Sequence, residues 1–345
     1  MQKGWFDKYF TAIKVVIMLV AYGYLVYMLA TFKMYREFAE SLQHISLTRM
    51  GCLAAVFLLV LVNWGLESLK WHQLLAHLAP TSFIQATKQV LIGLTAGFFT
   101  PNRIGEPIGR SLLLPEGKRS QGVALMMVGV MGQTFASLVY GVVGCIGFLS
   151  LHHSTSMPFD LWLTFGGVLL SLLSLLYLTL PSWGQCVITG KLSSFWQFMY
   201  DIRSGLLRFS CFTNWLKSLI PYLKAALSVS YSTLLKVTLY SLLRYGVYCL
   251  QYFLMLRFFD IQIDTLTALL IIPVNYLAVS ATPSIAFAEM GIRGSLAIVF
   301  LGAFSENTVG VALASISIWL INYVCPMLLG SVLLLRTKKT INVKQ

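Results

Sequence analysis

This sequence has few charged residues. Asp, Glu, Lys and Arg together make up 11% of its 345 residues, whereas a soluble domain of average composition carries about 25%. Acidic residues are especially scarce, with 12 Asp and Glu against 25 Lys and Arg, while 57% of the chain is hydrophobic. So little charge on so apolar a chain excludes a soluble globular protein and indicates a polytopic membrane protein.

The sequence also lacks the short motifs of several enzyme and metal-binding classes. No C-x-x-C spacing occurs among its six cysteines, so neither a zinc site nor a disulfide framework is expected. His152 and His153 have no cysteine or carboxylate cluster beside them, which disfavours a metal site. Gly117-Lys118 lacks the upstream glycine and the following Ser or Thr of a nucleotide-binding P-loop. We therefore expect no catalytic residues, no metal and no cofactor.

The basic excess gives a formal net charge of +13, but it does not indicate nucleic-acid binding. Lys and Arg cluster between the apolar segments, as the positive-inside rule describes for membrane proteins. No basic patch lies outside that membrane context. Nucleic acid is therefore not an expected partner.

Six segments are apolar enough to cross a membrane, which takes about 20 residues. They are 10–31, 50–69, 121–150, 159–180, 231–256 and 309–335. Two further apolar regions do not fit a single full membrane span. Residues 89–100 are too short, because the apolar run stops at Pro101. Residues 265–304 are expected to be interrupted by Pro273, Pro283 and Gly291. The expected fold is an all-α polytopic membrane protein with about six full spans plus two broken or re-entrant segments.

Loop charge predicts the topology of these segments. The basic region 181–230 and both termini are expected in the cytoplasm, while loops 151–158 and 302–308, which have no Lys or Arg, are expected outside. Residues 89–110 must then enter from the cytoplasm and return to it. Residues 265–304 must enter from outside and return there. The two broken segments would dip into the membrane from opposite faces, which is the arrangement of an inverted repeat.

The domain organisation follows from the same segments. We expect a single transmembrane domain over 1–345, with repeat-like halves at 50–180 and 231–335. Between them, 181–230 has apolar residues at helical spacing with basic residues among them, which predicts an amphipathic cytoplasmic segment on the inner leaflet. A connector packed against the helical bundle is the alternative.

One motif occurs twice inside the apolar segments. The copies are Thr100-Pro101, Glu106 and Arg110, and then Thr282-Pro283, Glu289 and Arg293. Residues four apart share a helix face, so each Glu–Arg pair is expected to form an ion pair. Ionisable groups at membrane depth are costly and usually functional. An ordinary interfacial ion pair beside a turn is the alternative for one copy, and the repetition favours function.

Unwound backbone and arginine side chains at these breaks suit a phosphate group. Arg244 lies in the middle of the span 231–256 and needs a partner, for which Glu106, Glu289 or a lipid phosphate would serve. Asn63 and Glu67 share a helix face. For these two residues, the alternative to a role in headgroup binding is a structural polar contact between helices. The predicted headgroup-binding residues are Arg103, Glu106, Arg110, Arg244, Glu289 and Arg293, supported by Asn63, Glu67 and Asn275.

The first motif carries a family resemblance. Thr100-Pro101-Asn102-Arg103-Ile104-Gly105-Glu106, followed by Arg110, is similar to the signature of the lysylphosphatidylglycerol synthase transmembrane family, also described as flippase-like. The stretch from Pro283 to Glu289 resembles the second signature, with fewer glycines. The resemblance runs from about residue 10 to 335 and implies re-entrant helices and lipid translocation. Full-length members continue into an aminoacyltransferase domain; this chain ends at Gln345, so lipid aminoacylation by it alone is not expected.

These observations predict flippase-like translocation of an anionic or aminoacylated phospholipid, or a related lipid-linked molecule, across a bacterial-type inner membrane. We do not expect an enzyme. One alternative is a lipid-modifying transferase that uses the same carboxylates as acid and base. The other is a membrane scaffold for envelope enzymes. The expected partners are phospholipid and an envelope lipid-synthesis enzyme.

Overall fold

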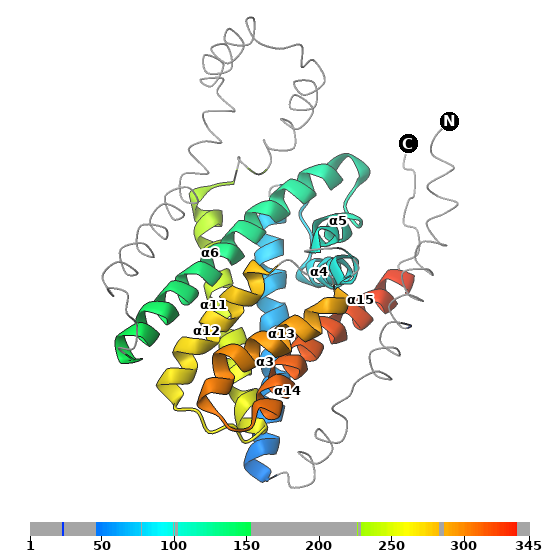
Figure 1. Cartoon of the computed structure of the whole chain (residues 1–345). Coiled ribbons are helices and arrows are strands. Elements are labelled where there is room, and N and C mark those ends of the chain that lie inside the picture. The colour runs from blue at the N-terminus through cyan, green and yellow to red at the C-terminus, as the bar shows by residue number, and fades with distance from the viewer. Residues whose placement is uncertain are drawn as a thin grey trace, which may run out of the picture. The chain divides into compact units, whose positions relative to one another are not determined.

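The computed structural model describes residues 46–76, 78–98, 103–152, 229–282 and 286–336, together with positions 23, 100 and 226. Helices make up nearly all of this part of the chain, and it contains no strand (Figure 1). The expectation of an all-α protein is therefore confirmed. The expected spans 10–31 and 159–180, most of the loop 181–230 and both termini lie outside the described residues.

Three helical stretches are long and apolar enough to cross a membrane. They are α3 (Leu47–Leu75), the stretch Glu116–Leu149, which comprises the 3-10 turn η2 (Glu116–Lys118) and most of α6 (Arg119–His152), and the stretch Thr308–Arg336. α11 (Tyr231–Phe258) is 28 residues long but carries three basic residues, Lys236, Arg244 and Arg257. The chain is thus a multi-pass membrane protein, and the count of six spans stays a prediction.

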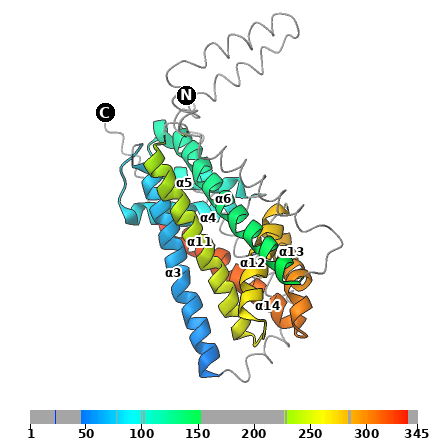
Figure 2. The ribbon, with the colours of Figure 1, turned by 90° about the vertical axis from the view of Figure 1, so that its left-hand side faces the viewer.

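The chain divides into two compact units. One, called here the motif unit, contains 1–62, 88–110 and 248–345 and so holds both Thr-Pro motifs. The other, called the Arg244 unit, contains 63–87 and 111–247. The helices α3 and α11 contribute residues to both units and lie side by side (Figure 2). The predicted repeat halves 50–180 and 231–335 stay a prediction.

The first broken segment is a tight helical hairpin. α4 (Phe83–Phe98) and α5 (Gly105–Ser111) follow each other closely. A Cβ added at Gly93 would lie 2.3 Å from Arg110 Cγ, and one added at Gly109 would lie 2.6 Å from Ala96 Cβ. Glycines four apart on each helix, at positions 93 and 97 and at 105 and 109, therefore allow the two backbones to approach this closely.

The second broken segment consists of α12 (Thr265–Ala281) and α13 (Ala286–Leu301). The expectation that Pro273 and Gly291 interrupt this region was wrong, because Pro273 lies inside α12 and Gly291 inside α13. A proline removes one backbone donor from a helix, and surrounding helices can compensate within a membrane. α12 ends at Ala281, directly before Thr282 of the second Thr-Pro motif, and α13 begins at Ala286.

α12 begins at a side-chain cap. The carboxylate of Asp264 accepts the backbone N–H groups of Leu266 at 3.0 Å and Thr267 at 3.1 Å. The N–H of Thr267, helped by that of Leu266, holds the pKa of this carboxyl below its usual range. A charged cap at this point fixes the start of the helix that leads to the second break.

The C-terminal helix has a local irregularity. α14 (Thr308–Trp319) continues through a π-helical turn, η4 (Leu320–Val324), into α15 (Cys325–Arg336). Pro326 lies two residues after the turn and has no backbone N–H to donate to the residue four positions before it. Such π turns are frequent at functional sites, and this one contains Tyr323.

α15 packs directly on α4. Thr95 Oγ1 donates to the carbonyl oxygen of Met327 at 3.0 Å. A Cβ added at Gly330 would lie 2.1 Å from the carbonyl oxygen of Leu91, so the two backbones are in contact at this point. This packing fixes the first hairpin against the C-terminal helix within the motif unit.

Candidate functional site

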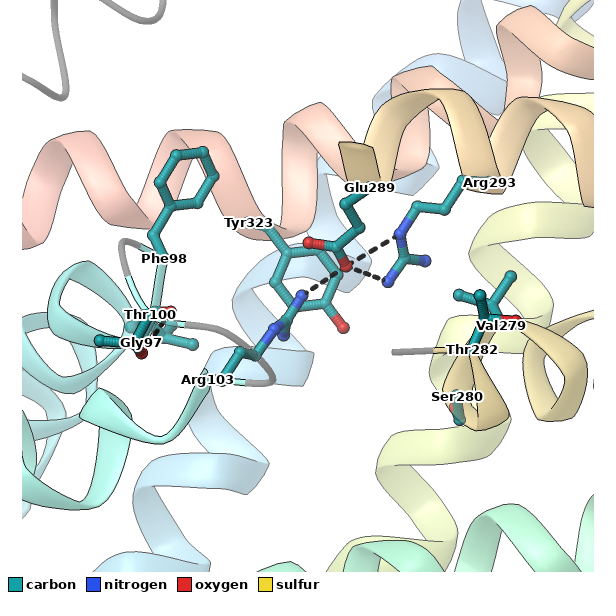
Figure 3. Close-up of a pocket in the computed structure, with 11 residues that line it drawn as sticks. Gly97, Phe98, Thr100, Arg103, Val279, Ser280, Thr282, Glu289, Arg293 and Tyr323 are labelled. Carbon is teal, nitrogen blue, oxygen red and sulfur yellow. Dashed lines mark hydrogen bonds and ion pairs between the residues drawn. The ribbon is translucent and has the colours of Figure 1, made fainter. Parts of the chain in front are cut away.

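The two motifs meet within the motif unit. Arg103 Nη2 donates to Glu289 Oε1 at 2.9 Å, although the two residues are 186 positions apart. Arg293 donates to the same oxygen from Nε at 3.1 Å and from Nη2 at 2.7 Å (Figure 3). One carboxylate oxygen therefore accepts three N–H groups, from guanidinium groups of both motifs.

The backbone at the first break positions Arg103. Its φ of +58° lies in the left-handed region, which residues with a side chain seldom adopt. The Thr100 hydroxyl accepts the N–H of Gly105 at 2.8 Å and donates to the carbonyl of Gly97 at 3.0 Å. The threonine of the motif thus ties the end of α4 to the start of α5, with Arg103 between them.

Tyr323 is a site residue that sequence reasoning missed. Its ring centroid lies 3.6 Å from Arg103 Cζ and 5.2 Å from Arg293 Cζ. A guanidinium over an aromatic ring gains about 0.5–1 kcal/mol at an exposed site and about 2 kcal/mol where water is excluded. Pro326 is the one sequence signal near Tyr323. A proline indicates an irregular helix, but it does not predict which residues the Tyr323 ring contacts.

A cavity of about 390 Å³ adjoins these groups. Pockets for small molecules usually begin at about 300 Å³. Residues from α4, the first break, α12, α13 and η4 line it: Leu94, Gly97, Phe98, Thr100, Arg103, Val279, Ser280, Thr282, Glu289, Arg293 and Tyr323. In Figure 3, Arg103, Glu289 and Tyr323 lie together, and Val279, Ser280 and Thr282 lie apart from them on one side of the view. The lining therefore combines charged, hydroxyl and apolar side chains, which suits the polar end of an amphiphile.

Two of the hydroxyl groups that line the cavity, those of Ser280 and Thr282, are already used as donors. Ser280 Oγ donates to the carbonyl of Tyr276 at 2.8 Å, and Thr282 Oγ1 donates to that of Ala278 at 2.9 Å. A hydroxyl that donates its proton still has lone pairs for accepting. Toward a ligand, these two oxygens therefore offer acceptors, while Arg103 and Arg293 offer donors.

The first Glu–Arg pair forms as its spacing predicts. Arg110 Nη2 donates to Glu106 Oε1. The Arg110 side chain is buried, and neither residue belongs to the cavity lining. Arg103, rather than Arg110, is therefore the arginine of the first motif that reaches the second motif. Headgroup binding by Glu106 and Arg110 stays a prediction.

Arg244 belongs to a separate buried cluster, inside the Arg244 unit. The expectation that Glu106 or Glu289 pairs with it was wrong: its Nη1 lies 2.6 Å from Glu67 Oε2, and its Nε donates to Asn63 Oδ1 at 2.7 Å. Gln133 accepts at 3.4 Å, and Lys70 Nζ lies 2.8 Å from the same Glu67 oxygen. The reason is helix placement, since α3 presents Asn63 and Glu67 on one face toward α11.

Asn63 and Glu67 thus form the polar contact between helices that the sequence offered as one alternative. Headgroup binding by these two residues and by Arg244 stays a prediction. Asn275 lies buried in α12, and its Oδ1 accepts no hydrogen bond from the described part of the chain. It is not part of the cavity lining.

Comparison with known proteins supplies one match. Residues 12–330 match the family described as the lysylphosphatidylglycerol synthase TM region. The match includes both Thr-Pro motifs, Arg244 and Tyr323. Comparisons with curated proteins and with solved structures give no match.

Proposed function

Because the chain belongs to the lysylphosphatidylglycerol synthase transmembrane family, a family of membrane domains with lipid-related roles, we propose that it translocates a lipid. The cargo would be an anionic or aminoacylated phospholipid, or a related lipid-linked molecule, moved between the leaflets of a bacterial inner membrane. One observation carries the proposal: arginines from both broken segments converge on Glu289 beside a cavity.

The lengths of the broken segments support re-entrant hairpins. α4, α12 and α13 have 16, 17 and 16 residues. At 1.5 Å per residue each is about 25 Å long, which is less than the hydrocarbon thickness of about 30 Å. Each segment can therefore enter the membrane and return to the side from which it came. Charge on the flanking loops favours opposite entry sides and cytoplasmic termini, as in an inverted repeat.

The cavity lining offers a role for each part of a lipid headgroup. Arg103 and Arg293 bind a phosphate, because guanidinium groups match phosphate geometry. Ser280 and Thr282 accept hydrogen bonds from an ammonium or hydroxyl group of the cargo. Leu94, Phe98 and Val279 contact its apolar part. Glu289 balances the arginine charge, which would otherwise be costly at membrane depth.

The test is a transport assay in proteoliposomes. Fluorescent headgroup-labelled phospholipid is added, and a membrane-impermeant quencher reports exposure of the label. The wild type should speed exposure, and Glu289→Gln should lower the rate. Arg293→Lys should lower it too, because lysine cannot donate from two fixed nitrogens to one oxygen. Glu306→Gln and Arg336→Lys are matched controls, since both residues are exposed, and they should transport like the wild type.

Equal rates for wild type, variants and empty vesicles, across anionic and aminoacylated lipids, would contradict transport and favour a scaffold. Mass spectrometry of the same lipids tests the transferase alternative. A change of headgroup mass that requires Glu289 would favour a transferase. Whether the chain translocates the lipid or modifies it, an enzyme of envelope lipid synthesis is the expected source of that lipid.

A further inference from the structure

We propose that Glu289 occupies the place of a phosphate group at Arg103, and that a phosphate-bearing ligand enters the cavity by displacing this carboxylate. The inference rests on the proposed function, since it concerns the same cavity. It names phosphate as the group that replaces the Glu289 carboxylate at Arg103. The Arg103–Glu289 ion pair is then a contact between the two broken segments that ligand binding breaks.

The two arginines hold Glu289 unequally. Arg293 contacts Oε1 through two nitrogens, and both residues lie on α13, four positions apart. Arg103 contacts the same oxygen through one nitrogen, and its side chain is 30% exposed beside the cavity. A single contact at a solvent-accessible guanidinium is the easier one to exchange, because water and ligand reach it directly. Displacement from Arg103 can therefore leave the Arg293 contact in place.

More N–H groups point at one carboxylate oxygen in the cavity than that oxygen can accept with good geometry. Three N–H groups converge on Glu289 Oε1. A phosphate group has several oxygens, so it can give each guanidinium an acceptor of its own and can accept bidentate bonds. Among the residues that line the cavity, two are Arg and one is Glu, so the lining has a positive balance. Its charge and its donor geometry therefore both favour an added anion.

The Tyr323 ring and the local backbone conformation both favour release of Arg103 from Glu289. The Tyr323 ring lies 3.6 Å from Arg103 Cζ, so a π face holds the guanidinium after the carboxylate has left. The left-handed backbone of Arg103, with φ of +58°, is a conformation that persists where surrounding contacts hold it. Releasing the side chain removes one of those contacts. Ligand binding then separates a residue of the first motif from a residue of the second.

The experiment measures anion binding to the full-length protein in maltoside micelles, which contain no phosphate. Isothermal titration calorimetry with inorganic phosphate compares the wild type, Glu289→Gln and Glu306→Gln. The last is the matched control, because it removes an exposed carboxylate that does not line the cavity. Glu289→Gln should bind phosphate about tenfold more tightly, a difference of about 1.4 kcal/mol, because the competing carboxylate is gone. Glu306→Gln should bind like the wild type.

Arg103→Gln should lose at least about tenfold in affinity, again about 1.4 kcal/mol. Thermal melts check folding of every variant. If Glu289→Gln does not fold, Glu289→Asp replaces it: the charge stays but the shorter side chain reaches Arg103 less well, so phosphate should bind more tightly than in wild type. If Glu289→Gln, or Glu289→Asp where it replaces it, binds phosphate no more tightly than Glu306→Gln, the exchange is overturned.

Added phosphatidylglycerol then distinguishes the source of the phosphate. If the lipid competes with inorganic phosphate, and competes better in Glu289→Gln, the ligand is a lipid headgroup. If inorganic phosphate binds as expected but the lipid does not compete, the exchange stands and lipid translocation fails. If neither ligand binds the wild type or Glu289→Gln, the exchange is overturned, even where the transport assay succeeds.

Discussion

Arg103 Nη2 and Glu289 Oε1 lie 2.9 Å apart and join the two Thr-Pro motifs of this chain. The residues come from the first break and from the start of α13, and Arg293 contacts the same carboxylate oxygen. Because one oxygen serves both arginines, a change at any of the three residues alters the electrostatic environment of the other two.

Tyr323 is expected to act through its aromatic face. Tyr323→Phe keeps the ring near Arg103 and Arg293 and should retain most of the transport rate. Tyr323→Leu removes the ring and should lower the rate by about two- to thirtyfold, since a cation–π contact is worth about 0.5 kcal/mol at an exposed site and about 2 kcal/mol where water is excluded. The proteoliposome assay measures both. A Phe variant as slow as the Leu variant would show that the hydroxyl, and not the ring, matters.

The Arg244 cluster is expected to depend most on its acid. Glu67 contacts both Arg244 and Lys70, so Glu67→Gln leaves two buried cations and should destabilise the protein more than Arg244→Ala. Breaking a buried ion pair costs about 3–5 kcal/mol. Thermal unfolding in detergent measures the order of stabilities.

A double-mutant cycle tests the pairing directly. The Arg244→Ala and Glu67→Gln double variant should be less destabilised than the sum of the single variants, because residues in contact are coupled by about 0.5–3 kcal/mol. Additive losses would mean that the ion pair does not contribute to stability.

Packing of α15 on α4 predicts that Gly330 cannot be replaced. The Cβ of Gly330→Ala would lie 2.1 Å from the Leu91 carbonyl oxygen, so the helices must move apart and the melting temperature should fall sharply. Gly65→Ala is the matched control in a helix interior, because its Cβ meets no described atom within 4 Å. Alanine is the better helix former by about 1 kcal/mol, so this variant should be as stable as the wild type or more so.

Loop charge predicts the topology, which labelling of single cysteines in intact cells can test. In a variant without its native cysteines, an impermeant maleimide added outside should modify His153→Cys and not Lys118→Cys. Lys118 lies in the basic stretch after the first motif and is expected in the cytoplasm. Labelling of position 118 from outside would contradict the re-entrant arrangement of 89–110.

Local physical chemistry made part of this structure predictable. The apolar lengths predicted α3, α6, α11 and the α14–α15 helix to within six residues at their ends, because membrane spans require long apolar runs. The pairs Glu106–Arg110 and Glu289–Arg293 followed from helical periodicity alone, since residues four apart must share a face.

Tertiary structure alone decided the remaining relationships. It paired Arg103 with Glu289, assigned Arg244 to Glu67, and placed Tyr323 beside two arginines. It also allowed α12 to continue through Pro273 without a break. Each of these depends on which helices pack together. Charge and periodicity along the chain specify which face a side chain lies on, but not which distant helix that face will meet.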